Sequence, residues 1–303
     1  MKKFRTAGII ALLSAIIITI SCKTHFETTH NSFTAVSSHE AMERGRVLVY
    51  SICAGCHYNR GVNKFIGNRI EDVPGIAGKV YSANLTHSKT YGVTEHYSDA
   101  EIKYLLKTGV AKDGRFLSYM LRPNMADADI NDIIVFLRSD DPGLAAADTS
   151  VGKTHFTLVG KMYMSAAAKP LPYNDGIKRP SVEEPVALGR YLVDNLGCFH
   201  CHSHSLTSLN LQNPEQSRGY LAGGFKMKGA NGTDVTVPNI TPDKNTGIGN
   251  FTREQFIKAV KDGEAPGHHL KPPMPPFKLL SDAEVGAIYA YIQTVPPVYN
   301  RVK

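Results

Sequence analysis

The sequence predicts an all-α fold with two tandem units, 38–140 and 182–303, joined by a long connection over 141–181. Three observations predict it: the same stretches recur in both halves, each half ends in an apolar pattern with helical spacing, and neither half contains a convincing alternating strand. The length of 303 residues suits about two domains of ~150 residues each. With 42% apolar and 20% charged residues, the composition is globular and argues against disorder or a coiled coil.

The N-terminal 21 residues predict an export signal. A basic start containing Lys2, Lys3 and Arg5 precedes an apolar run over 7–20. As a helix this run would measure ~21 Å, which is shorter than the ~30 Å hydrocarbon core of a bilayer. Thr19-Ile20-Ser21-Cys22 resembles a bacterial lipobox, which implies lipidation of Cys22. A plain secreted protein and an uncleaved anchor are the alternatives. Residues 22–37 are then a polar tether that holds the protein on a membrane surface.

The repeat runs through both halves in the same order. The matching stretches are Gly45-Arg46-Val47-Leu48-Val49 with Gly189-Arg190-Tyr191-Leu192-Val193, Asn84-Leu85-Thr86 with Asn239-Ile240-Thr241, and Gly92-Val93 with Gly247-Ile248. Each unit therefore predicts a first helix, a middle helix and a last helix. Gly45 and Gly189 lack a Cβ, which would let the last helix approach the first closely; the alternative is a simple helix weakness of ~1 kcal/mol.

Helix positions follow from capping boxes and apolar spacing. Three hydroxyl–acid or hydroxyl–amide pairs predict helix starts, at Ser98/Glu101, Thr252/Gln255 and Ser281/Glu284. Apolar residues at i, i+3, i+4 and i+7 place the last helices, at Ile130, Ile133, Ile134 and Leu137 and at Val285, Ile288, Tyr289 and Ile292. The connection 141–181 carries Gly143 and four prolines and predicts chain draped over one or both units.

Four of the five cysteines form two copies of one motif, Cys53-Ala-Gly-Cys56-His57 and Cys198-Phe-His-Cys201-His202. C-x-x-C-H is the attachment motif of c-type haem. Two thiols three positions apart can reach both vinyl groups of one porphyrin, and the adjacent His then lies under the iron as its proximal ligand. The sequence therefore predicts two covalently bound haem c groups.

Other uses of paired cysteines fit less well. A Cys₄ zinc site usually has its pairs ~15–20 residues apart, whereas here the two pairs lie in different halves. A thioredoxin-like redox pair needs a strand–helix–strand setting, which is not indicated around either motif. Structural disulfides would suit an exported protein but leave the His after each pair unexplained.

An electron carrier also needs a ligand on the far side of each iron, and Met is the usual choice for a raised potential. In the second unit, Met274 lies among four prolines just before the last helix; His268 and His269 are alternatives. In the first unit, Met120 occupies the equivalent place, while Met125 aligns with Leu280 and is expected in the core. The first-unit alternatives are Met125, His87 and His96.

These residues resemble class I c-type cytochromes, and the second half resembles the cytochrome c subunits of membrane-bound alcohol and sugar-acid dehydrogenases. The matching stretches are Gly197-Cys198-Phe199-His200-Cys201-His202, Tyr220-Leu221-Ala222-Gly223-Gly224-Phe225, Asn239-Ile240-Thr241-Pro242-Asp243, Thr246-Gly247-Ile248-Gly249 and Met274-Pro275. The resemblance implies two tandem cytochrome c domains and no catalytic residues. It also implies single-electron transfer between a dehydrogenase and the respiratory chain.

The expected partners are redox proteins, namely a dehydrogenase, a terminal oxidase or another cytochrome, on the periplasmic side of a bacterial membrane. The alternative function is a di-haem peroxidase, or another haem enzyme, with one iron open to substrate. The net charge of +7 includes the basic start of the export signal and is scattered along the chain. Nucleic-acid binders usually concentrate their charge on one face, so a nucleic-acid partner is not expected.

Overall fold

The computed structural model describes residues 26–29, 32–167, 169–228 and 233–302. The predicted export signal 1–21, Cys22 and the start of the tether lie outside the described residues. The described chain is mostly helical, which confirms the helical fold class expected from the sequence. Within the described ranges, no helix is both long and apolar enough to cross a bilayer.

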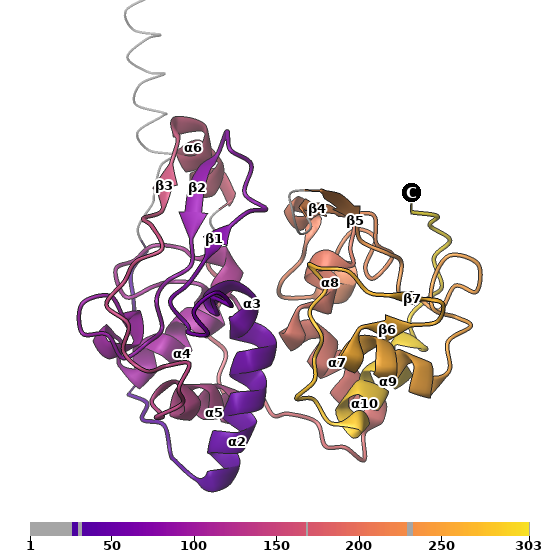
Figure 1. Cartoon of the computed structure of the whole chain (residues 1–303), viewed down its shortest axis with the longest axis horizontal. Coiled ribbons are helices and arrows are strands. Elements are labelled where there is room, and N and C mark those ends of the chain that lie inside the picture. The colour runs from indigo at the N-terminus through magenta and orange to yellow at the C-terminus, as the bar shows by residue number, and fades with distance from the viewer. Residues whose placement is uncertain (1–25, 30–31, 168, 229–232, 303) are drawn as a thin grey trace, which may run out of the picture.

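Two groups of helices lie side by side, as the indigo-to-magenta and orange-to-yellow parts of Figure 1 show. The first group comprises α2 (His39–Leu48), a π-helical turn (Val49–Cys53), α3 (Ala54–His57), α4 (Asp99–Thr108) and α5 (Asp127–Leu137). The second comprises α7 (Pro185–Leu196), α8 (Cys198–Cys201), α9 (Arg253–Asp262) and α10 (Asp282–Ile292). The 3₁₀ turns are Val93–His96, Ser118–Met120, Leu206–Ser208 and Pro214–Gln216.

Short strands, which the sequence did not predict, join loops between the helices. The strands are β1 (Arg69–Ile70), β2 (Gly78–Tyr81), β3 (His155–Phe156), β4 (Lys226–Lys228), β5 (Asp234–Thr236), β6 (Glu264–Ala265) and β7 (His268–His269). They pair antiparallel in the orders β1-β2-β3, β4-β5 and β6-β7. Strands of this length are too short to produce a detectable alternation in the sequence.

The first and last helix of each half cross at a glycine. A Cβ on Gly45 of α2 would lie 1.9 Å from the carbonyl oxygen of Asp132 in α5. A Cβ on Gly189 of α7 would lie 1.9 Å from the carbonyl oxygen of Ala287 in α10. The close approach expected at both glycines is confirmed, because any larger residue would collide with the backbone of the facing helix.

The three expected capping boxes are present. Ser98, Thr252 and Ser281 accept hydrogen bonds from the backbone N–H groups at the third helical position of α4, α9 and α10. In each case the Glu or Gln side chain at that position bonds back to the backbone of the capping residue. Reciprocal bonds of this kind satisfy N–H groups that a helix start otherwise leaves unpaired.

Each half is built around a hydrophobic core, and Ala126 of the first half packs into the core of the second. The first core contains Leu48, Phe65, Ile130, Ile134 and Phe136 among its fully buried members, together with Leu144 from the connection. The second contains Leu188, Leu192, Phe199, Val285, Ile288 and Ile292. The helix faces expected from apolar spacing are thus the ones that pack inward.

The connection lies against the first half and contains a helix, α6 (Leu158–Ala167), that was not predicted. Strand β3 extends the β1-β2 pair. The backbone N–H of Leu171 donates to the carbonyl oxygen of Thr108, and the N–H of Asp127 donates to that of Ile177.

A buried polar network joins the two halves. Arg44 of α2 contacts Asp129 of α5 at 3.4 Å and Glu284 of α10 at 2.5 Å. Arg179 of the connection reaches the same Glu284 oxygen at 2.9 Å, and the Tyr191 hydroxyl of α7 donates to Asp129 at 2.6 Å. Burial disfavours ionisation of Glu284, but Arg44 and the bonds from Ser281 hold its pKa below the ordinary value. Because its partners come from both halves, this network fixes their relative position.

Candidate haem sites

The first motif lies at the end of a continuous helical run. Helix α2 passes through the π-helical turn into α3, which carries Cys56 and ends at His57. The His57 ring is 6% exposed, and its Nδ1 lies 2.7 Å from the carbonyl oxygen of Ala83. Burial lowers the pKa of His57, so the ring is neutral and donates its proton from Nδ1. Its Nε2 lone pair is therefore free to bind a metal.

The second motif holds its His in the same way, although the helix before it is interrupted. Helix α7 ends at Gly197, whose φ of 79° is left-handed, and α8 then carries Cys198 and Cys201. The Nδ1 atom of His202 lies 2.9 Å from the carbonyl oxygen of Pro238, and burial lowers the pKa of this His as well. Both motifs thus present a neutral imidazole oriented by a backbone carbonyl, an arrangement typical of metal-binding histidines.

The carbonyl groups that orient the two histidines come directly before the repeated Asn-x-Thr stretches. The Asn84 side-chain oxygen accepts hydrogen bonds from the Thr86 N–H at 2.8 Å and from its hydroxyl at 2.7 Å. Asn239 accepts the same two bonds from Thr241, at 2.9 and 2.8 Å. These turns fix the preceding residues, Ala83 and Pro238. The repeat of Asn84-Leu85-Thr86 and Asn239-Ile240-Thr241 could be recognised in the sequence, but its role in orienting the two motif histidines could not. The only sequence signal for this role is the position of one residue directly before each Asn.

All four motif cysteines are half-buried, and none of them forms a disulfide. Burial raises the pKa of Cys53 and of Cys198 to about 12, and that of Cys201 to about 11. Among the described residues, no group of three or more His, Cys, Asp or Glu side chains is arranged to hold a metal ion.

Met120 and Met274 occupy comparable positions in the two halves. Both are half-buried, and each packs against the core of its own half. Met120 ends the 3₁₀ turn Ser118–Met120, and Met274 lies in the proline-rich loop before α10. Met125 is fully buried in the first core, which confirms its expected packing role.

The alternative histidine ligands are exposed or bonded elsewhere. His268 and His269 are exposed on β7. His87 engages both ring nitrogens, with Glu95 at 2.9 Å and with the Ser139 carbonyl oxygen at 3.0 Å. His96 is exposed, and its Nε2 lies 3.1 Å from the carbonyl oxygen of Lys89.

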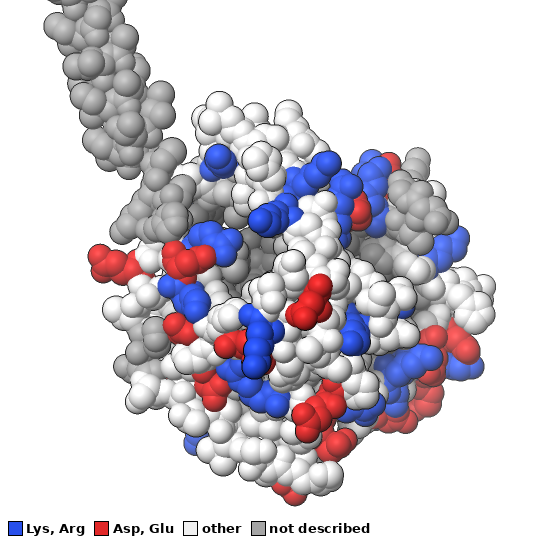
Figure 2. All heavy atoms as spheres, turned by 60° about the vertical axis from the view of Figure 1, so that its left-hand side comes forward, with Lys and Arg blue, Asp and Glu red and all other residues white. Residues whose placement is uncertain are grey.

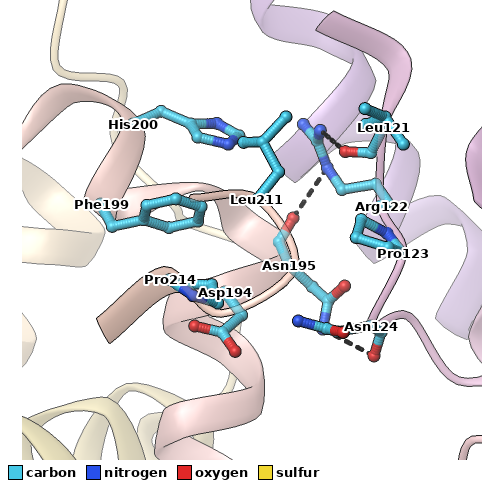
Figure 3. A pocket seen from close by; sticks show the side chains of 10 residues that line it. All are labelled: Leu121, Arg122, Pro123, Asn124, Asp194, Asn195, Phe199, His200, Leu211 and Pro214. Carbon is cyan, nitrogen blue, oxygen red and sulfur yellow. Dashed lines mark hydrogen bonds between the residues drawn. The ribbon is translucent and has the colours of Figure 1, made fainter. Parts of the chain in front are cut away.

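The two motifs face each other across the boundary between the halves. Figure 3 shows a crevice there, into which the His200 ring and the Arg122 guanidinium point from opposite sides. Arg122 Nε donates to the carbonyl oxygen of Asn195 at 3.1 Å. Burial, reinforced by Arg122, lowers the pKa of His200 to about 3. The sequence around His200 and Arg122 contains no local pattern that indicates that the two halves bring these side chains together.

The same guanidinium reaches the other motif. Burial raises the pKa of Cys56, and the charge of Arg122 opposes this rise. Beyond the effect of burial, Asp72 and Cys56 contribute to the raised pKa of Cys201. Cys56 of the first motif and Cys201 of the second therefore lie close enough to influence one another.

Residues 186–296 match the cytochrome c family, and the two C-x-x-C-H motifs, each with a carbonyl-oriented neutral His, are typical of c-type cytochromes. The chain resembles the cytochrome c subunits of dehydrogenases. It is 26% identical to the fructose dehydrogenase cytochrome subunit of Gluconobacter japonicus, over 98% of this chain and 60% of the relative.

Two further relatives match about a third of the chain. The gluconate 2-dehydrogenase cytochrome c subunit of Pantoea cypripedii is 38% identical over 37% of this chain and 24% of its own length. The cytochrome c subunit of the quinone alcohol dehydrogenase of Gluconobacter oxydans is 37% identical over 38% of this chain and 23% of its own length. The chain therefore spans only part of each of these relatives.

Proposed function

We propose that the chain is a di-haem c-type cytochrome that transfers single electrons between a dehydrogenase and the respiratory chain. The observation that carries the proposal is the doubled site: two C-x-x-C-H motifs, each with its His held by the carbonyl oxygen before an Asn-x-Thr turn. The relatives are named as dehydrogenase subunits, which supports a dehydrogenase as the electron donor.

In this proposal each half holds one haem. Cys53 and Cys56 attach the first, and Cys198 and Cys201 attach the second. The proximal ligands are His57 and His202, and the distal ligands are Met120 and Met274. Bound haem supplies one-electron iron chemistry. The protein's part is to orient each imidazole, to bury the site and to fix the separation of the two sites. No residue acts as a catalyst.

The domain boundaries and location belong to the same proposal. Residues 38–140 and 182–303 are two cytochrome c domains, and 141–181 is their connection. Residues 1–21 direct export, Cys22 is lipidated, and 22–37 tether the protein to the periplasmic side of a bacterial membrane. The separate cores of the two halves and their matching Gly45 and Gly189 crossings support two domains.

A haem count tests the proposal. The pyridine haemochrome of the purified protein should give two haems per chain, and Cys53→Ala/Cys56→Ala and Cys198→Ala/Cys201→Ala should each give one. The oxidised and reduced spectra should show low-spin haem and should not respond to carbon monoxide, because both distal positions are filled. A single haem in the unaltered protein would contradict the proposal. A carbon-monoxide-reactive haem would instead favour the open-iron enzyme.

A further inference from the structure

Helix α6 of the connection exposes its apolar side. Leu158, Val159, Met162 and Tyr163 are 75%, 52%, 61% and 52% exposed. Residues at spacings i, i+1, i+4 and i+5 share one face of a helix. The outward face of α6 is therefore a contiguous apolar surface, the reverse of an ordinary surface helix.

The opposite face of α6 is fixed to the first half. A Cβ on Gly160 would lie 1.9 Å from the Ala77 carbonyl oxygen, so the two backbones touch. At the start of the helix, the Thr157 N–H donates to the Ala77 carbonyl oxygen at 3.1 Å, and its hydroxyl donates to that of Ile76 at 2.5 Å. Ile76, itself 70% exposed, continues the apolar surface. We call Ile76, Leu158, Val159, Met162 and Tyr163 the α6 patch.

The charged residues on α6 and on the chain that flanks it are of one sign. Residues 151–170 contain Lys153, Lys161 and Lys169 and no Asp or Glu. Lys79, on β2, pairs across the strands with His155 of β3, and all four lysines are exposed. Figure 2 shows an uncharged lobe at the top of the molecule, at the level of α6 in Figure 1, with blue side chains around its base.

This combination fits a lipid surface better than a protein surface. Contact regions between proteins are depleted in Lys relative to the rest of the surface. Segments that lie in a membrane interface instead combine an apolar helix face with flanking Lys, which attract anionic headgroups. We propose that the α6 patch docks on an anionic lipid bilayer, with Leu158 and Met162 at the headgroup–acyl boundary and Lys153 and Lys161 on the lipid phosphates.

The inference goes beyond the proposed function and does not depend on haem or on lipidation. A lipid at Cys22 would hold the chain near the membrane but would leave it free to rotate on its tether. Docking of α6 would add orientation, with the first half turned toward the bilayer, because the helix is backed by β2 and β3 of that half.

Vesicle binding tests the inference with the tether lipid removed. The full-length holo-cytochrome carries Cys22→Ser and is exported with an ordinary cleavable leader. It is sedimented with vesicles of phosphatidylcholine alone or mixed equally with phosphatidylglycerol. We expect at least about tenfold stronger binding to the anionic vesicles, weakened by salt. Leu158→Glu/Met162→Glu should reduce it about tenfold or more, and Lys161→Gln by about fivefold.

The matched control is Val36→Glu/Val182→Glu, which alters two exposed apolar residues outside the α6 patch. It should bind like the unaltered chain. Vesicle binding that is absent, or that survives Leu158→Glu/Met162→Glu, overturns the inference. So does a shift from dimer to monomer caused by that variant, which would assign the patch to a second copy of the chain. The haem count is measured on the same samples, so failure of the proposed function shows separately.

Discussion

The two halves orient the His of each cysteine motif alike, but they differ in how the chain reaches the motif and in the loops that carry Met120 and Met274. In the first half the helix continues into the motif through a π-helical turn, whereas in the second it stops at Gly197 and restarts. Met120 closes a 3₁₀ turn that leads into the buried Leu121, whereas Met274 lies in a loop rich in proline.

The shared part is the one with strict geometry. A carbonyl oxygen must lie about 2.7–3.2 Å from the imidazole to orient it, and both halves reach this distance with the same Asn-x-Thr turn. A thioether on a flexible Met side chain can approach from several backbones. The comparison teaches that the turn that orients the His is built alike in both halves, while the backbone around Met120 differs from that around Met274.

The largest expected effect tests whether the two helix crossings are equivalent. Gly45→Ala and Gly189→Ala each place a Cβ 1.9 Å from a facing carbonyl oxygen, so the helices must separate. We expect each to destabilise the protein by about 3 kcal/mol or more and to lower the yield of holo-protein. Urea unfolding measures the change. The control is Gly75→Ala, which lies outside both motifs and where a Cβ meets nothing within 4 Å. If only one of the two glycines is sensitive, the halves are not built alike.

The second prediction separates the distal sides. Met274→Ala and Met120→Ala should each lower one of the two midpoint potentials by about 0.1 V or more, a fraction of the ~0.8 V span that axial ligation covers. Potentiometric titration followed by the visible spectrum measures the shift. Met125→Ala is the control: it should cost about 2–5 kcal/mol of stability through a core cavity and leave both potentials in place. Unchanged potentials in Met120→Ala would assign the first-half ligand elsewhere.

The smallest effect concerns a carboxyl group that the first half lacks. Asp194 lies five residues after Gly189, where the first half has Tyr50 after Gly45. Burial raises the pKa of Asp194 to about 7, and among the described residues its Oδ1 accepts no hydrogen bond. The folded state therefore binds this proton more tightly than the unfolded state. The stabilisation from the tighter proton binding of Asp194 is therefore fully present below pH ~4, and it is lost as the pH rises to about 7.

Asp194→Asn removes this dependence. The variant should be more stable than the unaltered protein by about 2 kcal/mol at pH 8, with little difference at pH 4. Urea unfolding at the two pH values measures it, with the exposed Asp140→Asn as the control. A variant that gains nothing at pH 8 would show that Asp194 is already ionised at little cost.

Features encoded by neighbouring residues could be predicted from the sequence. The capping boxes at Ser98, Thr252 and Ser281 and the close approaches at Gly45 and Gly189 are confirmed, since each depends on a short pattern or on one residue size. The residues of each C-x-x-C-H motif are adjacent in the chain, so the candidate sites could also be predicted from the sequence alone.

Features made by distant residues could not be predicted. Arg122 and His200 meet only because the halves pack in one particular orientation. Strand β3 forms because the connection folds back on β2, and the apolar residues of α6 gave no sign that they would be exposed. A single sequence contains no pattern from which contacts between such distant residues can be predicted.

The ion pairs that cross between the two halves also affect whether one half could fold without the other. Arg44 belongs to the first half and Glu284 to the second, yet neither has a complete set of partners without the other. In the first half alone Asp129 would keep Arg44 but lose the Tyr191 hydroxyl, whereas in the second half alone Glu284 would lose Arg44. The two halves therefore depend on one another for a complete polar network, and this shared network also sets the spacing of the two cysteine motifs.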